Sequence, residues 1–151
     1  MSFDRIVVAT DFSDSSREAL ELALPFAEKC GSELTLVHCW EAPSYSYAAG
    51  LYLPLDVIAP IERAAVARLE EATTQLKLRY PSAKSLLRAG APWEEVLSAA
   101  VQVKADLIVM TTDGRNGFLD ALRGSHSERI LRRTPCPLLA IPERSSLDAS
   151  L

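Results

Sequence analysis

The stretch RIVVATDFSDSSREALELALPFAEKCG (residues 5–31) opens the pattern that decides the fold. Its first six residues form an apolar, β-branched run in which only the first residue is charged. This predicts a strand buried on both faces, as in a parallel sheet. Ser15 and Glu18 then have the spacing of a capping box, and Gly31 ends the helical periodicity that follows. Pro25 interrupts that periodicity, so we expect a kinked or split helix.

The alternation of strand and helix patterns continues along the chain. Further strands are predicted at ELTLVHCW (33–40), KSLLRAG (84–90), ADLIVMTT (105–112) and CPLLAIP (136–142). Helices are predicted at about 54–80, 92–104 and 125–133, and a loop at 41–53. This order predicts an α/β fold, an open parallel sheet with helices on both faces. Ligands bind such sheets outside the carboxyl ends of the strands.

Composition excludes several classes of partner. The 151 residues fit one domain, and a net charge of −4 gives no general attraction for nucleic acid or anionic lipid. No apolar run approaches the ~18 residues of a membrane span, and we expect no secretory leader. The odd number and wide spacing of Cys30, Cys39 and Cys136 suit reduced thiols, so we expect a cytoplasmic protein without disulfides or zinc.

The segment TTDGRNGFLDALRGSHSERI (111–130) holds three of the six glycines. It matches neither G-x-x-x-x-G-K-[ST] nor G-x-G-x-x-G. Gly114, a nine-residue spacer and Gly124-Ser125 at a predicted helix start could still bind phosphate through backbone N–H groups and the helix dipole. The alternative is a structural turn, in which Ser125 and Glu128 form a capping box that satisfies the same N–H groups.

The chain resembles the universal stress protein family over almost its whole length. The resemblance rests on RIVVATDFSDSSREAL, LTLVHCW and DLIVMTTDGRNGFLDALRGSHSERILRRTPCPLLAIP. It implies a five-stranded, doubly wound parallel sheet of order 3-2-1-4-5 in three α/β/α layers, usually dimeric. The family domain would comprise residues 1–143, followed by a polar tail at 144–151. ATP-binding members carry G-x2-G-x9-G-[ST], and Gly114, Gly124 and Ser125 match its last three elements, whereas Thr111 occupies the first glycine position.

The resemblance also implies a site for ATP or a related adenine nucleotide, possibly with Mg²⁺. Asp11 would lie near the ribose and the phosphate-bound metal, and Val37 to Cys39 would meet the adenine. The nucleotide-binding residues implied in this way are Ala9, Thr10, Asp11, Val37, Cys39, Thr111, Gly114, Arg115, Gly124, Ser125 and Ser127.

Three functions follow from these observations. The first is a regulatory stress-response module that binds an adenine nucleotide and at most hydrolyses ATP slowly, because no clear general base is present. The second is a dimeric interaction module that does not bind ATP, which Thr111 and Asp113 favour. The third, an enzyme of adenylate chemistry, has less support because no second substrate site is apparent. The last strand, 136–141, is expected at a sheet edge, where pairing with a second copy would form a homodimer.

Overall fold

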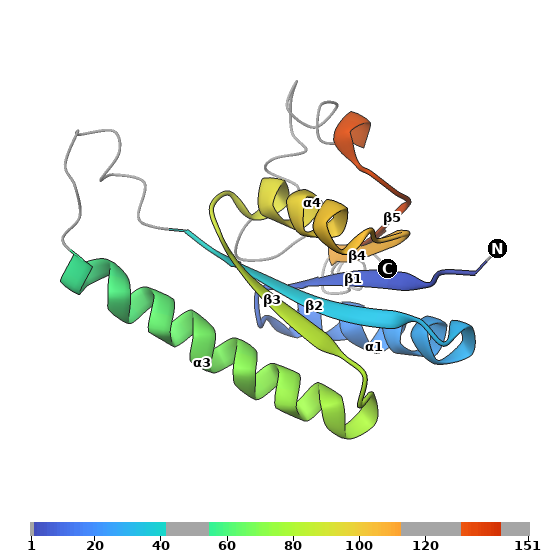
Figure 1. Cartoon of the computed structure of the whole chain (residues 1–151), viewed down its shortest axis with the longest axis horizontal. Coiled ribbons are helices and arrows are strands. Elements are labelled where there is room, and N and C mark those ends of the chain that lie inside the picture. Colours follow the sequence, from blue (N-terminus) through green and yellow to red (C-terminus); the bar gives the residue numbers. More distant parts are fainter. Residues whose placement is uncertain (1, 42–54, 113–130, 143–151) are drawn as a thin grey trace, which may run out of the picture.

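The computed structural model describes residues 2–41, 55–112 and 131–142. Its elements are β1 (Arg5–Thr10), α1 (Asp14–Cys30), β2 (Glu33–Trp40), α3 (Leu55–Arg79), β3 (Lys84–Ala89), α4 (Pro92–Val103), β4 (Leu107–Thr111) and β5 (Leu138–Ile141). The five strands form one parallel sheet of order β3-β2-β1-β4-β5 (Figure 1). The predicted fold class is therefore confirmed. The predicted tail, 144–151, and most of the helix predicted at 125–133 lie outside the described residues.

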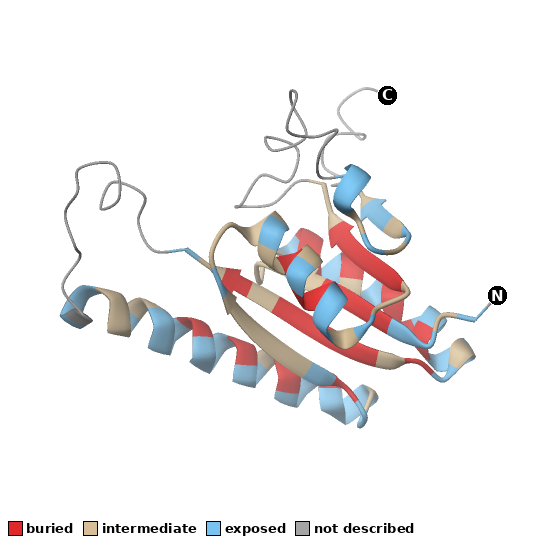
Figure 2. Ribbon diagram, turned by 45° about the horizontal axis from the view of Figure 1, so that its top comes forward, coloured by how far each residue is buried: buried red, intermediate tan, exposed pale blue. Residues whose placement is uncertain are grey.

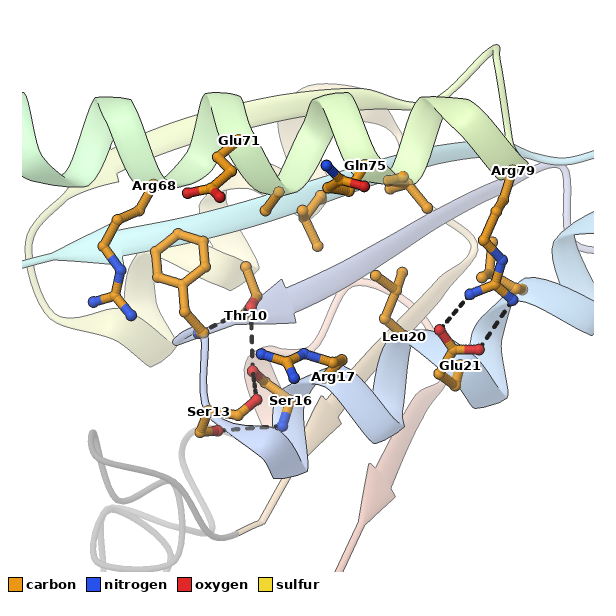
Figure 3. Close-up of a pocket in the computed structure, with 15 residues that line it drawn as sticks. Thr10, Ser13, Ser16, Arg17, Leu20, Glu21, Arg68, Glu71, Gln75 and Arg79 are labelled. Atoms are coloured by element: carbon orange, nitrogen blue, oxygen red, sulfur yellow. Dashed lines mark hydrogen bonds and ion pairs between the residues drawn. The ribbon is translucent and has the colours of Figure 1, made fainter.

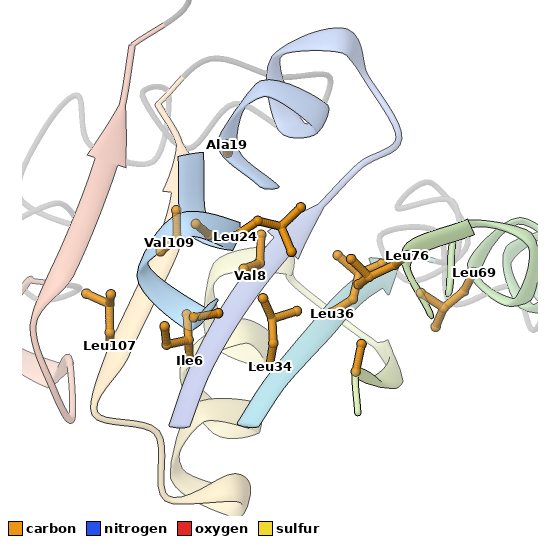
Figure 4. Packing of buried hydrophobic residues seen from close by; sticks show 13 residues of the cluster. Ile6, Val8, Ala19, Leu24, Leu34, Leu36, Leu69, Leu76, Leu107 and Val109 are labelled. Atoms are coloured by element: carbon orange, nitrogen blue, oxygen red, sulfur yellow. The ribbon is translucent and has the colours of Figure 1, made fainter. Parts of the chain in front are cut away.

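Helices cover both faces of the sheet because alternate residues of each central strand point to opposite sides. Ile6 and Val8 of β1 pack with α1 and α3 on one face, in the cluster drawn in Figure 4. Val7 lies between them and packs with α4 on the other face. Figure 2 shows buried residues concentrated in the central strands and exposed residues on the outer sides of the helices. The unbroken apolar runs of β1 and β4 are thus explained by burial on two faces.

The start of α1 differs from the predicted capping box. Ser13, not Ser15, is the N-cap, and its hydroxyl oxygen accepts a hydrogen bond from the Ser16 backbone N–H at 3.2 Å. Ser15 lies inside the first turn and is buried. The capping-box assignment was wrong because three closely spaced serines compete for the cap position, and the turn that follows β1 selects the first of them.

Pro25 does not split α1, which runs from Asp14 to Cys30 as one helix. The proline is exposed, while Ala23, Leu24 and Ala27 are buried against the sheet. The hydrogen bond that proline cannot donate is therefore missing on the solvent side. Packing of the apolar face keeps the helix continuous across it.

Two helices end on residues in the left-handed conformation. The cap of α1 is Gly31, with φ 64°, and its N–H donates to carbonyls of the last turn. The cap of α4 is Lys104, with φ 54°, and it makes the corresponding bonds to Ala100 and Val101. Glycine adopts this conformation without cost, whereas lysine does not.

The strand β5 lies at one edge of the sheet, as expected. It pairs only with β4 among the described strands, and Leu139 leaves 37% of its surface exposed. None of the helices that the structure describes is both long enough and apolar enough to cross a membrane.

Candidate functional site

The carboxyl ends of β1, β2 and β4 meet where the strand order reverses. Pairing of β1 with β2 continues to Thr10 opposite His38, whereas the recorded pairing of β1 with β4 ends at Val8 opposite Val109. In doubly wound sheets this is the position at which ligands bind. The side chains that follow β1 are therefore the first candidates for a binding site.

Asp11, the first residue after β1, is held in a fixed orientation by the turn that it begins. Its carboxylate Oδ1 accepts a hydrogen bond from the Ser13 N–H at 2.9 Å and a second from the Ser13 hydroxyl. Ser13 in turn caps α1 through Ser16. The acid predicted to meet the ribose and the metal is thus partly buried and hydrogen-bonded to the start of a helix.

Ala9 and Thr10 point to opposite faces of the sheet. Ala9 packs against the cluster under α4. The Thr10 hydroxyl lies toward α1 and α3, where it accepts from the Phe12 N–H at 3.0 Å and lies 3.1 Å from the Ser16 hydroxyl. A ligand at the end of β1 could therefore contact the backbone of both residues but the side chain of only one.

Val37 and Cys39 are core residues of the face that α4 covers. Val37 is 1% exposed and Cys39 5% exposed. Burial raises the pKa of the Cys39 thiol to about 12, and the carboxylate of Glu95 acts in the same direction. The thiol group lies 3.5 Å from the Pro92 carbonyl, to which it donates. These two residues can meet a ligand only through their backbone groups, because their side chains are packed.

An aromatic and cationic stack adjoins this site and was not predicted. Phe12 has φ 63°, which is unusual for a bulky residue, and its ring lies 4.3 Å from the His38 ring. The Arg68 guanidinium lies 4.6 Å from the centre of the Phe12 ring. The His38 Nδ1 lies 2.8 Å from the Thr10 carbonyl. Burial lowers the pKa of His38, and the Arg68 charge lowers it further.

Thr111 ends β4 and pairs with Ile141 of β5. It is partly buried at the carboxyl edge. The other residues predicted after β4 lie outside the described ranges, namely Gly114, Arg115, Gly124, Ser125 and Ser127.

The described residues could supply at most one ligand to a metal ion that is bound together with a nucleotide. Across residues 2–41, 55–112 and 131–142, no group of three or more His, Cys, Asp or Glu side chains could hold an ion. Mg²⁺ bound with a nucleotide needs only one or two carboxylates, because phosphate oxygens and water complete its coordination. Asp11 alone could fill that role.

The fold defines a class: a three-layer α/β protein with a parallel sheet of order β3-β2-β1-β4-β5, in which Asp11 follows β1 at the carboxyl edge. The family model described as "Universal stress protein family" matches residues 2–142. The chain belongs to the universal stress protein family.

Relatives and solved structures agree with this assignment. A universal stress protein of Thermus aquaticus is 34% identical over 139 residues, which cover 92% of this chain and 98% of that protein. The universal stress protein UspA from Lactobacillus plantarum has the same fold, with a TM-score of 0.74 at 24% identity over 93% of this chain and 99% of that one.

A universal stress protein in complex with cAMP has a TM-score of 0.66 and 26% identity, covering 93% of this chain and 98% of that chain. Some members of this structural group therefore bind adenine nucleotides.

Proposed function

We propose that this chain binds ATP or a related adenine nucleotide at the carboxyl ends of β1 and β4, as a regulatory module of a stress response. The observation that carries the proposal is the position of Asp11, an acid fixed at the strand end beside the switch point. The relative in complex with cAMP, 26% identical over 93% of this chain, supports the choice of ligand.

The proposed contacts are those that the family resemblance implies, and the position of Asp11 supports one of them. Asp11 faces the ribose and, when ATP is bound with Mg²⁺, the metal, which phosphate oxygens and water otherwise surround. The backbone at Val37 to Cys39 meets the adenine, since the side chains of Val37 and Cys39 are buried. The remaining contacts, to the phosphates, come from Thr111, Gly114, Arg115, Gly124, Ser125 and Ser127. Backbone N–H groups and a helix start suit this role.

Nucleotide binding would act by biasing contacts with partners or with a second copy. Among the described residues, we assign none to general base catalysis. The exposed edge of β5, with Leu139 at 37% exposure, supports a homodimer formed through residues 136–141. The free cysteines suit the cytoplasm.

A second candidate rests on Thr111. A β-branched side chain stands where ATP-binding members have the first motif glycine, and Asp113 adds a carboxylate that repels phosphate. On this reading the protein is a dimeric interaction module that does not bind ATP.

Titration calorimetry with ATP and cAMP, with and without Mg²⁺, tests the proposal, after any nucleotide carried through purification has been identified by chromatography. We expect Gly124→Asp and Asp11→Asn to weaken binding. Asp14→Asn is the matched control, because Asp14 is also in this segment but its side chain is 96% exposed. The lack of any binding at about 1 mM nucleotide would contradict the first function.

Thr111→Gly separates the two candidates, because it restores the family motif. If Thr111 obstructs the phosphates, the parent binds weakly or not at all and Thr111→Gly gains affinity. If the parent binds tightly and Thr111→Gly changes nothing, Thr111 is compatible with the site and the second candidate loses its support. Light scattering with and without nucleotide gives the oligomeric state, and we expect Leu139→Glu to weaken the dimer.

A further inference from the structure

A groove of about 530 Å³ lies between α1 and α3, separate from the packed interior under α4. The helix α1 packs over β1 and β4, whereas α3 packs over β2 and β3, so the two helices leave a trough above the centre of the sheet. Its volume is within the range of small-molecule sites. Figure 3 shows side chains from both helices pointing into it.

The floor of the groove is aliphatic. Leu24, Leu36 and Leu76 come from α1, β2 and α3, and each is at least 95% buried. Leu20 and Ala72 complete the apolar lining. These side chains carry no hydrogen-bonding group, so the floor favours a hydrocarbon chain over a polar ligand.

The charges divide the groove into two different ends. At one end, Arg79 of α3 forms a two-pronged ion pair with Glu21 of α1, including a contact of 3.0 Å between Nη2 and Oε2. This pair neutralises itself and closes the groove between the helices (Figure 3).

At the other end, Arg68 has no carboxylate partner among the residues that the structure describes, and its guanidinium lies against Phe12. Arg17 of α1 lies at the same end, paired with Asp14 only at 3.4 Å on the surface. Such an exposed pair is weak and can exchange for a ligand. Among the lining residues, this end has the two guanidinium groups of Arg17 and Arg68 and a single carboxylate, that of Glu71. This end therefore attracts an anion.

We propose that the groove binds a single-chain aliphatic anion, with its acidic head between Arg68 and Arg17 and its tail over the leucine floor. The lining residues of α3 run from Arg68 to Arg79, which is about 16 Å along a helix axis. A medium-length acyl chain fits that span without displacing the Arg79–Glu21 pair. The carboxylate of a fatty acid and the phosphate of an alkyl phosphate share this chemistry.

The test uses the full-length protein with decanoate, decyl phosphate and 1-decanol, measured by displacement of a dansyl-labelled undecanoic acid. We expect decanoate to bind about tenfold more tightly than octanoate, because added methylene groups are buried on the floor. The comparison of decanoate with decyl phosphate identifies the preferred head group. Binding of 1-decanol as tight as that of decanoate would overturn the role of the arginines.

Two variants with matched controls locate the site. Arg68→Glu should weaken decanoate binding at least tenfold, whereas Arg63→Glu, which makes the same charge change on the same helix outside the groove, should leave it within about twofold. Gln75→Trp should block the groove, and Ala67→Trp, which is exposed and outside it, should not.

Far-ultraviolet circular dichroism establishes that each variant is folded. The proposal is refuted if decanoate does not bind the parent, or if folded Arg68→Glu and Gln75→Trp bind it as the parent does. The groove shares Thr10 with the proposed nucleotide site, but Gln75 is not among the residues proposed to contact the nucleotide, so Gln75→Trp should keep the parent's nucleotide affinity. If the parent binds decanoate but does not bind ATP, the proposed function is contradicted and the groove proposal stands.

Discussion

Replacing Lys104 by glycine should stabilise the protein, although it removes a side chain. Lys104 ends α4 with φ 54°, and this conformation costs an L-residue about 1–2 kcal/mol. Glycine removes that cost but gains freedom in the unfolded chain, worth about 0.4–1 kcal/mol. The net gain in the free energy of unfolding is therefore about 0.5–1 kcal/mol. For a chain of this length, that raises the Tm by about 1–4 °C.

The Lys104 side chain forms no hydrogen bond or ion pair with the residues that the structure describes, so nothing of that kind offsets this gain. It is exposed, and the recorded bond at this position, from the Arg5 Nε at 2.8 Å, goes to the backbone carbonyl, which glycine keeps. Lys104→Ala is the control, because it removes the same side chain and retains the strained φ. We expect it to lie within about 0.5 kcal/mol of the parent.

The cap of α1 provides the reverse experiment. A Cβ added at Gly31 would meet no atom within 4 Å, so Gly31→Ala introduces backbone strain without a steric clash. It should lower the free energy of unfolding by about 0.5–1 kcal/mol. Urea unfolding followed by circular dichroism measures all three variants. If Lys104→Gly is no more stable than Lys104→Ala, the left-handed backbone conformation at the cap does not determine the difference in the free energy of unfolding.

Three further predictions concern the site. Ser13→Ala should cost about 1 kcal/mol of stability, measured by urea unfolding, because it removes the N-cap of α1; equal stability would contradict the cap assignment. His38 has a lowered pKa in the folded protein, so the unfolded chain binds its proton first and stability falls as pH drops through about 6.5. His38→Gln should flatten this part of the stability profile, and an unchanged profile would show that other groups cause it. Cys39, with its thiol pKa raised to about 12, should react with a disulfide reagent far more slowly than the less buried Cys30 at pH 8, and equal rates would show that the site opens.

Sequence patterns were most informative where burial on two faces dictates the residue types. The bounds predicted for β1 and β2 match the structure, because each run is mostly apolar and β-branched and is bounded by polar or turn-forming residues. The strands β4 and β5 are shorter than predicted, at Leu107–Thr111 and Leu138–Ile141, since apolar residues continue into the adjoining turns. The strand order came from family resemblance, because periodicity carries no information on which strands are neighbours.

The position of one residue of the candidate site could be predicted from the sequence, whereas the placement of side chains from other elements could not. Asp11 could be expected at a strand end, because residues that follow a buried strand reach the carboxyl edge of the sheet. The stack of Arg68 on Phe12 could not be expected, since it depends on a positive φ at a bulky residue and on the placement of α3. The groove was equally hidden, because the separation of two helices is a tertiary property.

Hydrogen bonds link the Asp11 carboxylate directly to the start of α1, so that the two should move together. Ser13 donates to Asp11 and caps the helix through Ser16, and the Ser16 hydroxyl lies 3.1 Å from that of Thr10. A ligand that draws the Asp11 carboxylate away from Ser13 must loosen the first turn of α1. Arg17 lies close to that turn, so a nucleotide bound beside Asp11 would also shift a residue that lines the groove. Faster amide hydrogen exchange in the first turn of α1 on addition of nucleotide would show this coupling.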